Sequence, residues 1–160
     1  MFHKFINISQ IEYRILFAEE CDTAMELVWR VFLRFEAPEY PKDGVDAFYD
    51  SIHNVDFRQQ LQLYGAFHEN VLVGVIATRK NGRHIALFFV DQRYQKLGIG
   101  KNLFQLVCQY NQSREITVNS SPFAIKVYEH LGFLATDTEQ MVDGLRFTPM
   151  IYKGGFDYGM

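Results

Sequence analysis

A glycine-rich segment flanked by basic residues is the part of this sequence whose residue types suggest chemistry most directly. Gly98-Ile99-Gly100 follows an apolar run that ends at Val90, and amphipathic helical spacing begins after it. A turn between a buried strand and a helix leaves backbone N–H groups unpaired at the positive end of the helix dipole. Such a turn can hold phosphate oxygens, and Arg93, Lys96 and Lys101 add positive charge around it.

Two common phosphate-binding motifs are excluded by counting residues around this loop. A Walker A loop requires glycine where the sequence has Gln95, and Ser or Thr where it has Asn102. A dinucleotide-binding fingerprint requires glycine where the sequence has Leu103. The pattern that remains is Gln-x-x-Gly-x-Gly, from Gln95 to Gly100, which by itself also fits glycines that serve only close helix packing.

That pattern resembles the pyrophosphate-binding loop of the GCN5-related N-acetyltransferase (GNAT) family. A second block, residues 118–133, resembles the strand, capped helix and Leu-Gly-Phe sequence of the same family. Residues 143–152 resemble the final strand of its small bacterial members. Two blocks in the right order are more specific than either alone, and the resemblance covers roughly residues 11–153.

The resemblance implies an acyl-CoA site along the apolar strand and the glycine loop. In the family, this strand separates from its neighbour at a bulge, and the pantetheine arm pairs with the exposed backbone. Here Phe88, Phe89 and Val90 would supply those contacts. Asn119, on the next strand, would reach the pantetheine amides, the alternative being a strand-end cap. The pyrophosphate cradle would comprise Gln95, Lys96, Leu97, Gly98, Ile99, Gly100 and Lys101.

Acyl transfer from a thioester to an amine needs a neutral amine, a donor for the oxyanion and a proton for the thiolate. We expect the backbone N–H of Val90 to serve the oxyanion. Tyr128 matches the family's helix tyrosine near the thioester sulfur, and a phenol is protonated at neutral pH. We therefore expect Tyr128 to be the general acid, the alternative being an aromatic anchor between helix and sheet. The general base stays open among Glu36, Glu39, His53 and a water-mediated route.

The first third of the chain predicts a strand followed by two helices. Alternating apolar residues indicate a strand over residues 11–17. Asp22 or Thr23 is expected to cap the helix that follows, with Glu26 as the capping-box partner of Thr23. A second helix is expected from about Gly44.

The middle of the chain is rich in strand signals. Residues 63–68, 71–78 and 84–90 indicate three antiparallel strands, the last of them buried on both faces. Glu69-Asn70 fits a two-residue turn between the first two. Asn81-Gly82 predicts a two-residue type I′ turn between the last two, because both residues tolerate positive φ.

Helix and strand signals alternate after the glycine loop. A short strand at residues 115–118 precedes a helix that Ser120 or Ser121 caps, with Pro122 in its first turn and Gly132 at its end. Two more strands are expected around residues 133–139 and 145–152. This order predicts an α/β fold, an α+β mixed antiparallel and parallel sheet with helices on both faces, as in GNAT-like acyl-CoA N-acyltransferases. We expect an N-terminal extension (1–10), one domain (11–153) and a C-terminal tail (154–160).

Composition narrows the class of protein. The 160 residues, 48% of them hydrophobic, suffice for one buried core, and the net charge of −3 argues against duplex nucleic acid as a partner. The longest apolar run, Ile85–Val90, is too short to span a membrane, and no signal-peptide block precedes it. Neither the cysteines, Cys21 and Cys108, nor the histidines show metal-ligand spacing, so we expect a cytoplasmic protein without a metal.

Charge and aromatic residues suggest the acceptor only weakly. Residues 1–60 hold 11 acidic and 6 basic side chains, whereas residues 61–160 hold 8 and 10. The acidic half favours a cationic amine such as a polyamine, an aminoglycoside or a lysine-like amine, the alternative being a chance division of surface charge. Six aromatic residues could line an acceptor pocket or pack in the core: Trp29, Phe32, Phe35, Tyr40, Phe48 and Tyr49.

The predicted function is an acyl-CoA-dependent N-acyltransferase. Its cosubstrate would be acetyl-CoA, and its acceptor a primary amine of a small molecule or peptide that attacks the thioester directly. One alternative is a non-catalytic acyl-CoA-binding sensor or regulatory module on the same fold, and another is a plain interaction domain. A homodimer is a further expectation, because the closing strand of this fold often joins a dimer contact.

Overall fold

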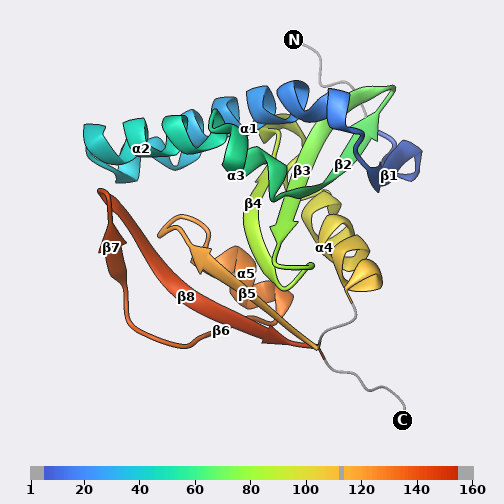
Figure 1. The fold of residues 1–160 in the computed structure, drawn as a ribbon. Helices are drawn as coiled ribbons and strands as arrows, with labels where there is room; N and C mark the ends of the chain where they lie inside the picture. The colour runs from blue at the N-terminus through green and yellow to red at the C-terminus, as the bar shows by residue number, and fades with distance from the viewer. Residues whose placement is uncertain (1–5, 112–113, 155–160) are drawn as a thin grey trace.

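A mixed sheet of eight strands organises the chain (Figure 1). The computed structural model describes residues 6–111 and 114–154, so parts of the predicted extension (1–5) and tail (155–160) lie outside the described residues. The strands are β1 (Ile11–Ile15), β2 (Gln62–His68), β3 (Val71–Arg79), β4 (His84–Val90), β5 (Glu115–Ser120), β6 (Leu134–Ala135), β7 (Gln140–Val142) and β8 (Leu145–Lys153). The α-helices are α1 (Cys21–Phe35), α2 (Lys42–Ile52), α3 (Val55–Gln59), α4 (Ile99–Tyr110) and α5 (Ile125–Leu131).

The strand order is β1-β2-β3-β4-β5-β8-β6, with β7 paired to β8. Neighbouring strands are antiparallel except β4 and β5, which are parallel. The helix α4 connects that parallel pair, as a crossover connection requires. This arrangement confirms the predicted mixed sheet.

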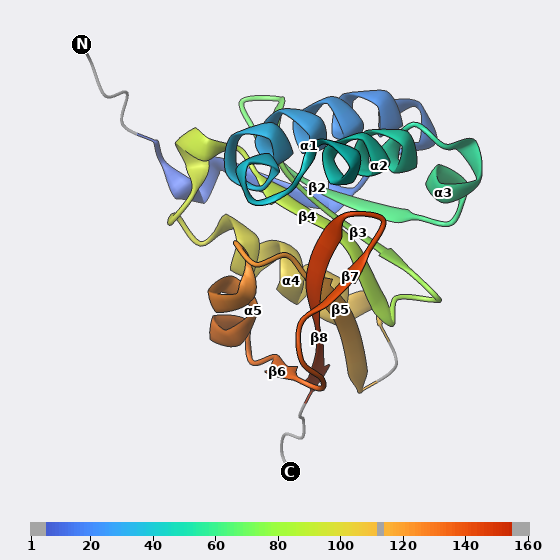
Figure 2. The ribbon, with the colours of Figure 1, turned by 90° about the vertical axis from the view of Figure 1, so that its left-hand side faces the viewer.

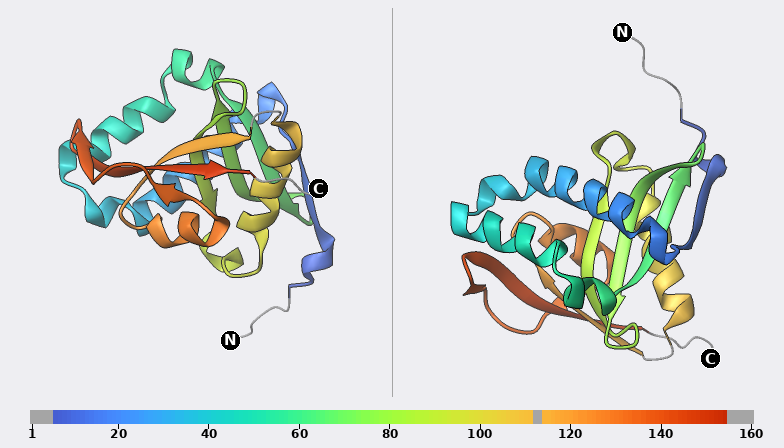
Figure 3. Two further views of the ribbon diagram at one scale, coloured as in Figure 1. Left: turned by 90° about the horizontal axis from the view of Figure 1, so that it is seen from below. Right: turned by 45° about the horizontal axis from the view of Figure 1, so that its top comes forward.

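Helices cover both faces of the sheet and enclose two hydrophobic cores (Figures 2 and 3). One core joins α1 and the end of α2 to β2, β3 and β4, with Phe32 and Ile52 fully buried. The other joins α4 and α5 to the opposite face, with Leu103 and Phe133 at its centre. No helix in residues 6–111 and 114–154 has the length and apolar character that crossing a membrane requires.

The strand β4 pairs with β5 only through its first two residues, which meet the middle of β5. His84 pairs with Thr117 and Ile85 with Val118, and the parallel pairing goes no further in the described residues. Ala86 is the extra residue of a β-bulge on β4, since the register with β3 shifts there. The two strands diverge beyond this bulge (Figure 1). The separation of strands expected from the family resemblance is therefore present.

The start of α1 differs from the prediction. The helix begins at Cys21 rather than after a cap at Asp22 or Thr23, and the capping box expected there does not form. A 3-10 turn leads directly into the helix, because the Glu20 carboxylate in that turn is fixed by both guanidinium nitrogens of Arg14, at 2.9 and 2.8 Å.

The β3–β4 connection also differs. It has four residues, Lys80–Arg83, because the ladder closes with Arg79 paired to His84. The Arg83 carbonyl instead accepts the N–H of Thr117 on β5, at 2.8 Å. The predicted two-residue type I′ turn is wrong, although Asn81 does adopt positive φ. The Glu69-Asn70 turn is confirmed, with φ of 52° and 67°.

The helix α5 starts later than predicted. The Ser121 hydroxyl accepts the N–H of Ala124 at 3.2 Å, so it caps the turn over residues 122–124, and the helix begins after this turn, at Ile125. Its end at Gly132, with φ of 105°, agrees with the prediction. This turn places Phe123 and Ala124 in the lining of the candidate active site.

Candidate active site

The diverging part of β4 presents a backbone edge that no described strand pairs with. The N–H of Asp91 donates to the Val73 carbonyl on β3, at 2.8 Å. Because alternate residues of an antiparallel strand face opposite neighbours, the N–H groups of Phe88 and Val90 point away from β3. They face the gap between β4 and β5. This edge can pair with an extended, amide-containing ligand.

The glycine loop ends in an anion-binding geometry. Gly98 is the N-cap of α4 with φ of 84°, and a Cβ placed on it would meet nothing within 4 Å. No acidic residue lies in the first turn of α4 and no side chain caps its free N–H groups. Lys96, with φ of 64°, adopts a left-handed conformation that costs a non-glycine residue about 1–3 kcal/mol. The loop thus holds backbone N–H groups towards open space, where an anion is favoured.

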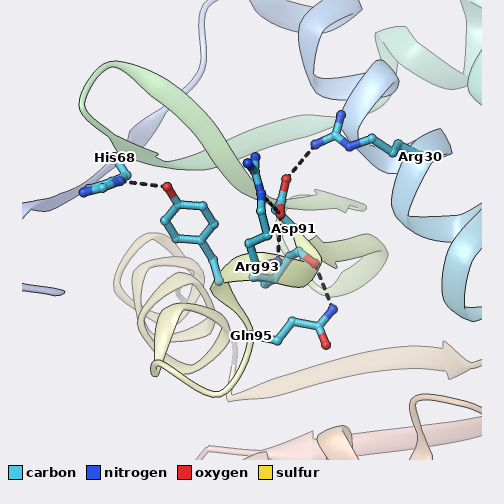
Figure 4. Close-up of polar contacts among 7 residues, drawn as sticks. Arg30, His68, Asp91, Arg93 and Gln95 are labelled. Carbon is cyan, nitrogen blue, oxygen red and sulfur yellow. Dashed lines mark hydrogen bonds and ion pairs between the residues drawn. The ribbon is translucent and has the colours of Figure 1, made fainter. Parts of the chain in front are cut away.

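The Gln95 side chain ties this loop to the strand. Its Nε2 atom donates to the Val90 carbonyl at 3.0 Å (Figure 4). That hydrogen bond occupies the carbonyl but leaves the Val90 N–H for a ligand. Gln95 therefore braces the loop, a contribution that its place in the motif did not reveal.

Asp91 anchors the other end of the loop and was missed by the sequence analysis. Only 5% of its side chain is exposed, and it accepts hydrogen bonds from Arg30 on α1 and from the N–H of Arg93, both at 2.9 Å (Figure 4). Burial pushes the pKa of Asp91 upward, but these hydrogen bonds outweigh it and hold the pKa below its ordinary value. The signal in the sequence was the position of Asp91, an acidic residue in the same loop as the basic residues Arg93 and Lys96. Nearby, Tyr94 Oη lies 2.8 Å from Nδ1 of the buried His68.

A cavity of about 400 Å³, the donor cavity, lies against the glycine loop. Leu97 does not line it, and Asn119 lines a different cavity. The predicted residues that line it are Phe88, Phe89, Val90, Gln95, Lys96, Gly98, Ile99, Gly100, Lys101 and Tyr128. Its other lining residues are Val31, Phe35, Glu36, Tyr94, Phe123, Ala124 and Val127. The residues predicted for the acyl-CoA site thus largely meet in one place.

A second cavity of about 300 Å³, the acceptor cavity, adjoins the first. The two share Glu36, Phe88, Phe89, Ala124 and Tyr128 as lining residues. The side chains that the acceptor cavity adds include Phe32, Tyr40, Phe48, Asn119, Ser121, Asp143, Arg146 and Phe147. A ligand in each cavity would meet the other at the shared residues.

The shared lining residues form the junction of the two cavities, and two of them, Glu36 and Tyr128, have titratable side chains. Burial at the C-terminal end of α1 raises the pKa of Glu36 to about 7, against the opposing effect of a hydrogen bond with Ser121. The negative end of the helix dipole acts in the same direction as burial. Tyr128 is 6% exposed and its ring contacts Phe88 and Phe133. Burial, and then the charge of Glu36, raise the pKa of the Tyr128 phenol.

The other two candidate bases lie elsewhere. The Glu39 carboxylate is 3.5 Å from the guanidinium of Arg146, and neither cavity includes Glu39 in its lining. His53 is exposed, lies 2.8 Å from the Tyr49 carbonyl through Nδ1, and stacks on the Tyr49 ring. Of the three candidate bases, Glu36 is the one that lines both cavities.

Comparison with known proteins gives the same fold. A family model described as an acetyltransferase (GNAT) domain matches residues 36–153. A GCN5-related N-acetyltransferase structure from Rhodopseudomonas palustris has a TM-score of 0.78 at 17% identity, covering 94% of this chain and 99% of that one. The PaiA N-acetyltransferase of Thermoplasma acidophilum, solved with coenzyme A, has a TM-score of 0.67 at 20% identity, covering 90% and 99%.

FeeM, an N-acyl amino acid synthase from uncultured soil microbes, has a TM-score of 0.64 at 19% identity, covering 89% of this chain and 90% of that one. None of the curated proteins matches the sequence. At these identities the structural likeness establishes the fold alone.

Proposed function

The chain belongs to the GNAT acetyltransferase family and is therefore an acyltransferase that uses acyl-CoA, and we propose that it transfers the acetyl group of acetyl-CoA directly to a primary amine. The observation that carries the proposal is the junction of the two cavities at Glu36 and Tyr128. An acid and a base there would serve both sides of one transfer. The PaiA structure with coenzyme A supports an acyl-CoA donor.

The donor would bind along features already described. Its pyrophosphate would accept hydrogen bonds from the free N–H groups at the start of α4, near Lys96 and Lys101. Its pantetheine amides would pair with the open edge of β4, where the Val90 N–H is free. The thioester would then lie at the junction.

The chemical step needs three proton movements, two from the amine nitrogen and one to the sulfur. Ionised Glu36 would take a proton from the ammonium, because its pKa of about 7 leaves a substantial ionised fraction at neutral pH. The amine nitrogen forms a bond to the thioester carbon, and the oxyanion is stabilised by the N–H of Phe88, which lines both cavities, rather than by that of Val90, which lines the donor cavity alone. The tetrahedral intermediate then loses the second proton of its nitrogen to water and expels the thiolate as the C–S bond breaks. Tyr128 would give that sulfur its proton, and solvent restores both side chains.

The donor site can be tested by calorimetry with acetyl-CoA on the wild type, Gly98→Glu and Gly82→Glu. Gly82 is a matched control, because its φ is also 84° but it lies in the β3–β4 connection. We expect micromolar binding in the wild type and Gly82→Glu, and its loss in Gly98→Glu. A wild type that does not bind acetyl-CoA would refute the proposal. Binding without acyl transfer to any amine would instead favour the sensor alternative.

A further inference from the structure

The acceptor cavity has an aromatic wall built from two helices and the turn between them. The rings of Phe32 on α1 and Phe48 on α2 stack with centroids 3.9 Å apart and planes within 8° of parallel. Tyr40 continues the series, 5.9 Å from Phe32 at 11°. Phe147 lines the same cavity from β8. Phe32 is buried and its ring is covered by Trp29, Tyr40 and Phe48. The partly exposed rings of Tyr40, Phe48 and Phe147 are therefore the ones on which a planar ligand group can stack.

Neighbouring aromatic residues do not belong to this wall. Tyr49 follows Phe48 on α2, but its ring contacts Trp29 and His53, and it lines neither cavity. Phe35 lines the donor cavity and stacks on Phe123. Trp29 joins Tyr49 to the wall, because its ring contacts both Phe32, at 5.8 Å, and Tyr49, at 5.0 Å. Of the six aromatic residues singled out in the sequence, those that line the acceptor cavity are Phe32, Tyr40 and Phe48.

The charges in the acceptor cavity favour an amine and disfavour a carboxylate. Glu36 lies at the inner end and Asp143 also lines the cavity. Arg146 is the basic residue of the lining, and its guanidinium is 3.5 Å from both Glu39 and Glu139. Its charge is therefore already balanced. Among the described residues from 1 to 60, Glu36 is the one acidic residue that lines the acceptor cavity. The excess of acidic residues in that part of the sequence therefore gives no support for a polyamine acceptor.

The size of the cavity suits a small acceptor group. Its volume of about 300 Å³ lies at the lower end of small-molecule sites, which span roughly 300–1,000 Å³. Extending the proposed function, we propose that the acceptor is an arylalkylamine, a primary amine on a short alkyl chain that ends in one aromatic ring and carries no carboxylate. The amine reaches Glu36 and Tyr128, and the ring stacks on the aromatic wall.

A panel of acceptors tests this class on the wild-type protein. Thiol release from acetyl-CoA is measured with 2-phenylethylamine, 2-cyclohexylethylamine, ethylamine, phenylalanine and spermidine. We expect kcat/KM for 2-phenylethylamine to exceed that for each of the others by about tenfold or more. Equal or faster reaction with any of the others would overturn the arylalkylamine class while leaving the transferase function in place. Thiol release at the same rate without any amine would mean that the protein only hydrolyses acetyl-CoA, and it would refute both the arylalkylamine class and the transferase function.

Substitutions on the wall locate the ring. Phe48→Leu keeps apolar volume but removes the aromatic face, so it should lower the ratio of kcat/KM for 2-phenylethylamine to that for ethylamine about three- to tenfold. Tyr49→Leu is the matched control and should leave that ratio unchanged. Phe147→Leu makes the same test from β8 if thermal melting shows that Phe48→Leu is unfolded. An unchanged ratio in the folded wall variants would overturn the proposal.

Discussion

Glu36 at the end of α1 and Tyr128 on α5 line both cavities, and in the part of the chain that the structure describes they are the titratable side chains that do so. Burial raises the pKa of both, and the charge of Glu36 raises that of Tyr128 further. Near neutral pH, the carboxylate is therefore close to its pKa while the phenol keeps its proton. That difference separates a base from an acid within one site.

Replacing Tyr128 with phenylalanine tests the acid. The ring contacts with Phe88 and Phe133 remain, so the fold and the affinity for acetyl-CoA should stay near those of the wild type. Loss of the proton donor should lower kcat about 10²-fold or more. Steady-state kinetics with calorimetry checks both quantities. An unchanged kcat would remove Tyr128 from the reaction.

Replacing Glu36 with glutamine should stabilise the protein at high pH. Because the folded pKa of about 7 lies above the ordinary 4.5, the folded state binds more protons between these values, and ionisation destabilises it. The gain should approach about 3 kcal/mol above pH 7 and vanish near pH 4. Thermal melts of both proteins at pH 4 and pH 8 measure it. A gain that is the same at both pH values would show that the pKa of Glu36 is not raised in the folded protein.

Asp91 can be tested as the anchor of the glycine loop. Asp91→Ala leaves Arg30 without its partner and removes the hydrogen bond to the Arg93 N–H. We expect a loss of about 1–3 kcal/mol in unfolding free energy and weaker acetyl-CoA binding, because the hydrogen bonds to Asp91 are lost while the exposed Arg30 is hydrated. Urea titration and calorimetry would check these effects, with Asp91→Asn as the variant that keeps a hydrogen-bonding side chain. Full stability and affinity in Asp91→Ala would show that the loop does not depend on this contact.

The pairing of β4 with β5 at His84 should be less stable in acid. Burial, and then the charges of Arg79 and Lys80, lower its pKa to about 4, and its Nδ1 lies 2.7 Å from the Thr117 hydroxyl. Because the folded pKa lies below the ordinary 6.5, the stabilisation by neutral His84 is lost as pH falls from 6.5 towards 4.

The loss attributable to His84 should reach at most about 3 kcal/mol. Comparing unfolding of the wild type and His84→Gln at pH 7 and pH 5 isolates this contribution. The wild type should lose more stability than the variant on acidification. Equal losses would show that protonation of His84 does not reduce the stability of the protein.

Local signals in the sequence predicted the elements that carry the donor site. Gly98 and Gly132 lie at helix ends with positive φ, as glycines in such patterns do, and Glu69-Asn70 forms the expected turn. The start of α5 was not predictable in this way. Either serine could cap a helix, and the structure uses Ser121 for the turn before the helix instead.

Long-range packing explains what the sequence left open. Glu36 and Glu39 are equivalent in local pattern, and contacts with distant segments distinguish them, since the Ser121 turn approaches Glu36 whereas Arg146 pairs with Glu39. The same holds for Asp91, whose partner Arg30 is 61 residues away in the chain. Adjacent Phe48 and Tyr49 likewise differ only in which neighbour their faces meet.

The most direct test of the central claim is the pH dependence of kcat/KM for acetyl transfer in the wild type and in Glu36→Gln. If Glu36 is the base at the junction, the wild-type value should fall as pH drops below about 7, because the carboxylate becomes protonated. The variant should be slower by about 10²-fold or more and should lack this ionisation. A variant that keeps both the rate and the ionisation of the wild type would contradict the account.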